Sequence, residues 1–338
     1  ILGTNTLTVN GSETGVTTIG DVTSVSTGAL TITAADNAAN VTPTIGSVDI
    51  TGAGAITVLS PSGATDRTVT VAITNGMSTG GALSVTTTEA GGAGPASLSV
   101  GGVTSVTGTT TISSADNAGS TAIVTLTGNA TLTGTATITG NTDFATLNLN
   151  GATNVATGGI ILAGTAAKAS VNFTNTADAT FTGTIDSVDG TDRGVVSILG
   201  GTNLVTLASN IGVTQNILAL NVGSATLGGN ASFTGIVEAA TITVFTQVAD
   251  DAAADFNANV IATNIAITGG NGAGENASAN FAANVTGIIT FTDGSGTSTA
   301  TFDGTTAQTV VGNVVAATDG HGIINVTNAA GVTFSDNV

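Results

Sequence analysis

The chain has 338 residues, with 3 Lys or Arg against 21 Asp or Glu, and its formal charge at pH 7 is −18. Nucleic-acid binding needs clustered cations, and the only cations are Arg67, Lys168 and Arg193, so a nucleic-acid reader is excluded. Anionic membrane surfaces are disfavoured for the same reason, the apolar runs are too short for a spanning helix, and we expect no direct membrane insertion. The lack of Cys excludes disulfides, thiolate metal sites and cysteine nucleophiles.

Residues 1–128 consist of short runs in which apolar and hydroxylated residues alternate, each closed by Gly, Asn, Asp or Pro. This pattern predicts strands separated by turns. The segment 17–38 returns at 98–118 with one residue deleted, so that Val22 maps to Val103 and Asp36 to Asp116. A spacing of about 80 residues fits three or four coils of a β-solenoid or one sandwich-like module. Both alternatives stay open for this half.

Composition changes near residue 140. All three prolines precede it, and all ten phenylalanines, beginning with Phe144, follow it. We therefore predict a boundary between about 125 and 145, which divides a β-rich region (1–128) from a β-solenoid (129–338). It separates either two domains or two styles of coil.

The second half repeats one phrase. It reads Ala-Thr-Phe-Thr-Gly-Thr at 179–184 and returns at 231–236, 254–259, 279–284 and 300–305. With Leu207 filling a gap, the apolar anchors fall at 181, 207, 233, 256, 281 and 302, in steps of 26, 26, 23, 25 and 21 residues. An alternating apolar strand keeps the same period out of phase, at Val171, Val196, Leu218, Ile242, Ile265 and Ile288. Two phrases with one period of 20 to 30 residues predict an all-β fold, a parallel β-helix with coils of about 21–26 residues.

In such coils a Phe at a fixed phase points inward, and the rings form a column along the stack. We interpret these phenylalanines as core. Asn residues that recur after strands are interpreted as turn-forming or laddered amides, namely Asn148, Asn150, Asn172, Asn221, Asn325 and Asn328.

Two acid clusters are candidate calcium sites, because hard cations take several oxygen ligands from closely spaced carboxylates. The first is Asp186, Asp189 and Asp192 in a Gly-containing segment, and the second is Asp250, Asp251 and Asp255. The spacing matches neither the EF-hand loop nor the calcium-binding nonapeptide. A solvated loop with Asp192 beside Arg193 is the favoured alternative for the first cluster, and a loop or short turn for the second.

No enzyme is predicted. His321 is the only histidine, no Gly-x-Ser-x-Gly elbow occurs, and Tyr and Trp, which would provide sugar platforms, are absent. The Gly-rich segment 269–275 lacks the Lys of a phosphate loop, so we interpret it as a plain loop. Eight Asn-x-Ser/Thr sequons allow glycosylation as a hypothesis.

Phrases such as Ala-Thr-Phe-Thr-Gly-Thr, Asn-Val-Thr-Gly-Ile-Ile-Thr-Phe and Ile-Ile-Asn-Val-Thr-Asn-Ala-Ala-Gly-Val-Thr-Phe resemble the coils of rickettsial surface antigens of the outer membrane protein B type. More broadly they are similar to autotransporter passengers and alphaproteobacterial surface-layer proteins, over about residues 125–338. The resemblance implies an extracellular β-helical rod on a bacterial cell surface that forms a lattice or coat, or adheres to host cells.

The leading hypothesis is a self-assembling surface-layer or coat subunit whose main partner is itself. The charge of −18 predicts that divalent cations such as Ca²⁺ relieve repulsion between subunits during assembly. An adhesin that binds a host receptor or a cell-surface glycan is the alternative, and a polysaccharide-acting enzyme on the same fold is a third. Uniform coils favour a lattice, whereas long loops favour an adhesin or an enzyme.

Overall fold

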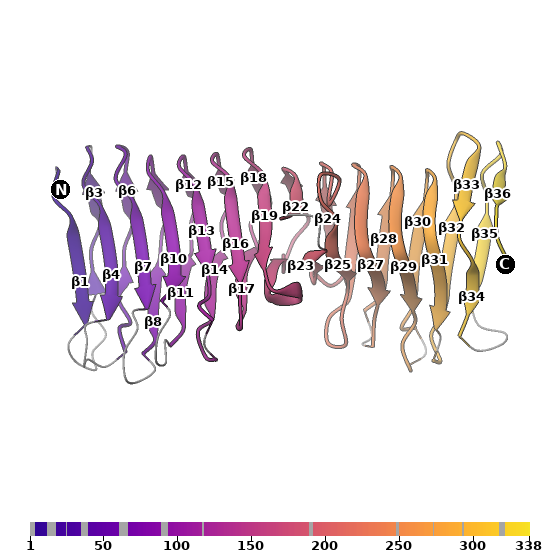
Figure 1. Cartoon of the computed structure of the whole chain (residues 1–338), viewed down its shortest axis with the longest axis horizontal. Coiled ribbons are helices and arrows are strands. Elements are labelled where there is room, and N and C mark those ends of the chain that lie inside the picture. The colour runs from indigo at the N-terminus through magenta and orange to yellow at the C-terminus, as the bar shows by residue number, and fades with distance from the viewer. Residues whose placement is uncertain are drawn as a thin grey trace. The chain divides into compact units, whose positions relative to one another are not determined.

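The computed structural model describes residues 4–11, 18–24, 26–34, 40–60, 67–88, 94–116, 118–188, 192–247, 250–272, 274–292, 294–317 and 322–338. Within these residues the regular structure is β-strand, apart from one 3-10 turn, η1 (Ala166–Lys168). All strand pairs are parallel, and the predicted parallel β-solenoid is confirmed (Figure 1). The chain divides into two compact units, Ile1–Val171 (unit 1) and Asn172–Val338 (unit 2).

Each coil of unit 1 gives one strand to each of three parallel sheets, which we call faces 1, 2 and 3. Face 1 has the order β1 (Leu7–Gly11), β4 (Leu30–Ala34), β7 (Ile56–Ser60), β10 (Leu83–Thr87), β13 (Thr110–Ser113), β16 (Ala136–Gly140) and β19 (Ile160–Gly164). Face 2 has β2 (Thr18–Ile19), β5 (Thr44–Ile45), β8 (Val69–Ile73), β11 (Ala96–Val100), β14 (Ala122–Leu126), β17 (Ala145–Leu149) and β20 (Ala169–Phe173), whose last two residues belong to unit 2. Face 3 has β3 (Val22–Ser24), β6 (Val48–Ile50), β9 (Met77–Thr79), β12 (Thr104–Val106), β15 (Ala130–Leu132) and β18 (Thr153–Ala156).

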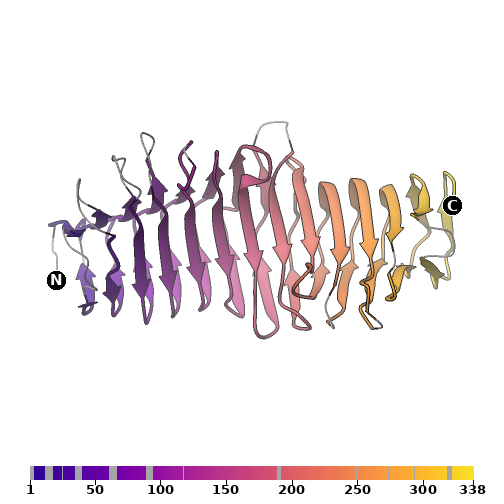
Figure 2. The same ribbon diagram turned by 90° about the horizontal axis from the view of Figure 1, so that it is seen from below.

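The alternation of apolar and hydroxylated residues explains why these segments form strands with one buried side. In β4, Leu30, Ile32 and Ala34 are buried, whereas Thr31 and Thr33 face outward. Strands of the inner coils repeat this pattern, as in β7, β10, β14 and β16, and successive coils cover one another's apolar side chains. Two views of the ribbon show the strands of successive coils side by side within each unit (Figure 2).

The parallel pairing of residues 7–126 resolves the fold of the first half as further coils and excludes the sandwich-like alternative. The repeat of about 80 residues is three coils long, since Val22 pairs with Val48, Val48 with Met77, and Met77 with Thr104. The match of Val22 to Val103 was therefore wrong by one residue: Thr104 is buried, and Val103 is 65% exposed. A one-residue shift turns a side chain to the other side of a strand. Asp36 lies outside the described residues.

Glycines line one corner of the unit 1 coils, between faces 3 and 1. A Cβ added to Gly81 would lie 2.4 Å from the carbonyl oxygen of Gly54, and one added to Gly108 would lie 2.5 Å from that of Gly81. The same relation continues to Gly134 and Gly158. Backbones of successive coils therefore touch at this corner, and only glycine leaves the room. We call this column the glycine ladder.

The strands of unit 2 belong mainly to faces 2 and 3. Face 3 has β21 (Ala179–Thr182), β24 (Leu204–Leu207), β26 (Gly229–Phe233), β28 (Ala252–Phe256), β30 (Ala277–Phe281), β32 (Ser298–Phe302) and β35 (Ile323–Val326). Face 2 has β23 (Arg193–Ile198), β25 (Ile217–Val222), β27 (Val237–Phe245), β29 (Val260–Thr268), β31 (Val285–Thr292), β33 (Gln308–Val311) and β36 (Val332–Phe334), and β34 (Val314–Ala316) also pairs with β31. In unit 2, face 1 is reduced to β22 (Ile185–Ser187) and the two bridges Ile185–Ile211 and Ile211–Val237. Val237 is the first residue of β27, and from there the long strands β27, β29 and β31 include the positions of face 1 as well as those of face 2.

The predicted column of apolar anchors is confirmed in unit 2. Phe181 pairs with Leu207, and the register continues through Phe233, Phe256, Phe281 and Phe302. All six side chains are 0–1% exposed. The rings from Phe233 to Phe302 stack with centroids 4.9–5.4 Å apart, and Phe334 meets Phe302 edge-on.

The second predicted phrase is in part misplaced. Val196 is in register with Leu220, not Leu218, and Ile265 is in register with Ile289, not Ile288. Leu220 and Ile289 are buried, whereas Ile288 is 38% exposed. Strict alternation fails at an irregularity in the pairing of β29 with β31, where the register shifts between Ile261 and Asn264 and Gly287 takes φ +145°.

Candidate functional site

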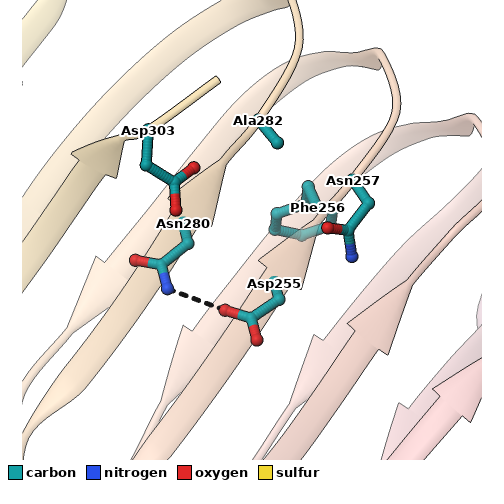
Figure 3. A pocket seen from close by; sticks show the side chains of 6 residues that line it. All are labelled: Asp255, Phe256, Asn257, Asn280, Ala282 and Asp303. Carbon is teal, nitrogen blue, oxygen red and sulfur yellow. Dashed lines mark hydrogen bonds between the residues drawn. The ribbon is translucent and has the colours of Figure 1, made fainter. Parts of the chain in front are cut away.

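A polar groove runs along the outer side of face 3 in unit 2. In a strand, the residues before and after a buried Phe point outward. Asp255 and Asn257 flank Phe256 in this way, and Asn280 and Ala282 flank Phe281. A hollow of about 130 Å³ is lined by Asp255, Phe256, Asn257, Asn280 and Ala282, together with Asp303 beyond Phe302 (Figure 3).

The groove exists because Ala282 is small. The main-chain N–H groups of Asn257, Ala282 and Asp303 each donate to the carbonyl of the Phe one coil earlier, so these three residues occupy successive places in one outward column. Ala282 leaves a gap between its two larger neighbours. In the adjacent column the Asn280 side chain donates to Asp255 Oδ1 at 2.8 Å. Carboxylate and amide oxygens around a small hollow are the donor type that a hard cation prefers.

The first predicted acid cluster is only partly described. Asp186 is 7% exposed in β22, and its Oδ1 accepts the Thr214 N–H at 3.0 Å. Asp192 is exposed, and Asp189 lies outside the described residues. Asp186 therefore has a structural partner, and a calcium site formed by these three acids stays a prediction.

The three acids of the second predicted cluster have different surroundings. Asp251 Oδ1 accepts the main-chain N–H of Asn276 at 3.0 Å and its side-chain amide at 3.2 Å. Asp250 is exposed, and its carbonyl accepts the Thr246 hydroxyl at 2.6 Å. Of the three, Asp255 alone lines the groove, where Asp303 joins it. No group of three or more metal-ligating acids or histidines gathers among the described residues.

Sequence reasoning missed Asn257, Asn280 and Asp303. The signal for them was present in the repeated phrase, because each lies one residue away from a Phe anchor, on the outward side. Once the anchors are placed in register, their outward neighbours must form columns. The groove follows from those columns and from the small size of Ala282.

A second hollow lies on the outer side of face 2 in unit 2, at the end of β25. It has a volume of about 320 Å³ and is lined by Ser197, Leu199, Asn221, Gly223, Ser224, Ala225, Thr243 and Phe245. None of these residues is ionisable. Gly223 has φ +82° and starts the turn in which the Ser224 hydroxyl accepts the N–H of Leu227 at 3.0 Å. We call this hollow the Gly223 slot.

Amide side chains join successive turns of unit 2, at positions other than those named in the prediction. The Asn259 side chain accepts the Asn284 N–H at 3.3 Å, and the Asn284 side chain accepts the Thr309 N–H at 2.9 Å. Of the Asn residues predicted for this role, Asn148 donates to the Thr125 hydroxyl and Asn328 to Thr306 O. In the Gly-rich segment, the Glu275 carboxylate accepts the Gly272 N–H at 2.8 Å within a loop. His321 lies outside the described residues.

The comparisons identify no relative. No family model, no curated protein and no solved structure matches the chain. In the described part of the chain, no helix is both long enough and apolar enough to cross a bilayer.

Proposed function

We propose that the chain is a structural protein of a bacterial cell surface, a self-assembling surface-layer or coat subunit. One observation carries the proposal: face 1 of unit 1 is an uncharged surface on a strongly acidic chain. None of its seven strands contains Asp, Glu, Lys or Arg, namely β1, β4, β7, β10, β13, β16 and β19. Electrostatic repulsion between two acidic subunits is weakest where their uncharged faces contact each other.

The outward side chains of face 1 also form regular columns. Thr31 pairs with Thr57, Thr57 with Ser84, Ser84 with Thr111, and Thr111 with Thr137. Hydroxyls repeated at the strand spacing of about 4.8 Å give a flat, periodic surface, and packing of two such sheets is a recognised mode of stable association. The proposed contact is face 1 against face 1 of a second copy.

The coils are uniform, which supports a lattice more than a receptor-binding role. On face 3, residues that pair between successive coils are from 21 positions (Ala279 and Ala300) to 29 positions (Val48 and Met77) apart in the sequence. No large insertion separates successive coils, and backbone pairing between them makes each unit stiff. The extracellular location rests on the resemblance of the repeats to surface antigens and surface-layer proteins.

Calcium belongs to the proposal as a counter-ion. With a charge of −18, copies repel one another, and divalent cations at the polar groove would lower that repulsion. Asp255 and Asp303 supply carboxylates there, and Asn257 and Asn280 supply amide oxygens.

Negative-stain microscopy of the purified chain, with millimolar Ca²⁺ and with chelator, tests assembly. Sheets, tubes or filaments that form with calcium and dissolve in chelator are the expected result, and dispersed particles under both conditions contradict the proposal. A Thr57→Asp, Thr111→Asp variant places charge on face 1 and should abolish assembly. The matched control, Ser78→Asp, Thr131→Asp, places the same charge outward on face 3 and should leave assembly intact.

An adhesin that binds a glycan or host receptor is the second candidate. It is favoured by the Gly223 slot, a hollow of ligand size whose lining carries hydroxyl, amide and aromatic groups.

A further inference from the structure

We propose that the Gly223 slot binds a single neutral sugar ring between Leu199 and Phe245. The proposal deepens the adhesin candidate, on which it rests for its biological role, and it does not require self-assembly. It gives the ligand a chemical class and the slot its contact residues.

The walls of the slot follow from the strand register. Val222 pairs with Ile198 on one side and with Val244 on the other, and all three are buried. The next residues, Leu199, Gly223 and Phe245, therefore occupy one outward column on three successive coils. The middle residue has no side chain. The two walls lie two strand spacings apart, about 9.5 Å, and a single layer of carbon atoms in van der Waals contact with both needs about 8 Å.

The gap is fixed by the backbone at Gly223. Its φ of +82° disfavours any L side chain, and an added Cβ would lie 2.2 Å from the carbonyl oxygen of Phe245. Ser224 and Ala225, in the turn that follows, also line the slot. The gap between the two walls is therefore set by the backbone at Gly223, while the Leu199 and Phe245 side chains form the walls themselves.

A polar column lies beside the walls. Ser197, Asn221 and Thr243 are in register with one another, two residues before the wall residues. Within the described part of the chain, no hydrogen bond joins these three side chains to another protein group. Outward columns elsewhere do make such bonds, as between Asn257 and Ser232 at 3.1 Å or Asn148 and Thr125 at 3.1 Å. Two hydroxyls and one amide are thus available to a ligand.

The chemistry of the lining selects the ligand. Because none of the described residues that line the slot is ionisable, the lining offers no counter-charge for a phosphate, a carboxylate or an amine. A pyranose ring has C–H groups on its faces and hydroxyls at its edge. The C–H groups suit the negative face of the Phe245 ring, and the hydroxyls suit the amide and hydroxyl column. A flat aromatic ligand would fill the space between the walls but would leave the side chains of the polar column without hydrogen-bond partners.

Phenylalanine-labelled NMR of the whole chain tests the proposal directly. The chain has ten Phe and neither Trp nor Tyr, so ¹³C-labelled Phe rings give a simple spectrum. The probes are methyl glycosides of glucose, galactose, mannose and N-acetylglucosamine at millimolar concentration. We expect saturation transfer to the ring protons of at least one sugar and a shift of the Phe245 signal, identified by its loss in Phe245→Ala.

Three variants locate the sugar. Phe245→Ala removes one wall and should weaken binding about tenfold, the scale of one aromatic contact. Thr243→Val keeps the shape, removes one hydroxyl and should weaken binding about fivefold. The control is Phe144→Ala, which removes a ring that is 46% exposed in unit 1 and should leave binding unchanged. Circular dichroism confirms that each variant is folded.

Absence of saturation transfer to all four sugars overturns the proposal. Transfer that persists unchanged in both Phe245→Ala and Thr243→Val also overturns it, because the sugar then lies elsewhere. Microscopy of the Phe245→Ala protein with calcium separates this failure from that of self-assembly, since assembly through face 1 does not involve the slot.

Discussion

The ring of Phe256 lies parallel to the ring of Phe281, with centroids 5.3 Å apart and planes inclined by 8°. The two residues pair in register on β28 and β30, and both are 1% exposed. The separation follows the spacing of neighbouring strands, so the stack is a direct product of the coil repeat. Each ring in the middle of the column is covered on both sides by the rings of adjacent coils.

Phe256→Ala should destabilise unit 2 strongly. The substitution leaves a cavity between Phe233 and Phe281, and the loss of a buried Phe costs about 3–5 kcal/mol. Urea unfolding and hydrogen exchange of the amides in β28 and β30 measure the effect. Phe144→Ala removes an exposed ring that contacts Lys168 and should cost no more than about 1 kcal/mol. Equal losses of stability from the two substitutions would contradict the conclusion that the Phe column stabilises unit 2.

Gln308→Glu should destabilise the coil near β33. The Gln308 side chain is 2% exposed, and its Nε2 donates to the carbonyls of Phe281 at 2.7 Å and Ala283 at 2.9 Å. A carboxylate of the same shape has no proton for either carbonyl and buries a charge, at a cost of about 2–5 kcal/mol. Thermal unfolding compares this variant with Gln247→Glu at an exposed position, which should be neutral. A stable Gln308→Glu protein would show that the amide is dispensable.

Gly108→Ala should destabilise unit 1, although it adds a single methyl group. The new Cβ would lie 2.5 Å from backbone atoms of Gly81, and overpacking of this kind costs about 1–3 kcal/mol. Gly20 provides the control, because a Cβ there meets no atom within 4 Å. We expect Gly20→Ala to change the urea midpoint little and Gly108→Ala to lower it clearly. If Gly20→Ala lowered the urea midpoint more than Gly108→Ala, the backbone at this corner could shift to accommodate the methyl group.

Asp255→Asn, Asp303→Asn should abolish calcium binding at the polar groove. The double variant keeps the shape of the groove but removes both carboxylates, and the formal charge falls in magnitude from −18 to −16. Isothermal titration calorimetry with Ca²⁺ measures the loss of binding heat. Asp49→Asn, at an exposed position on β6, should bind as the unchanged chain does. Unaltered calcium binding by the double variant would remove the groove from the proposed mechanism.

Several features of the fold followed from the sequence because they depend on local pattern. The steps of 26, 26, 23, 25 and 21 residues between Phe181 and Phe302 are the lengths of the coils themselves, and the register of β21 to β32 reproduces them. A bulky apolar residue with alternating neighbours can be buried only if it points inward once per coil. Period, parallel pairing and core were therefore accessible from the chain alone.

The tertiary structure decided which residues of different coils become neighbours. The glycine ladder, the gap at Ala282 and the slot at Gly223 each depend on a small residue between two particular residues of adjacent coils. Coil lengths differ by a few residues, and an error of one residue reverses which side chains point outward, as the misplacement of Val103 and Ile288 shows. Composition and period fixed the kind of fold, whereas the candidate sites arise from contacts between residues about 25 positions apart, which only the folded register defines.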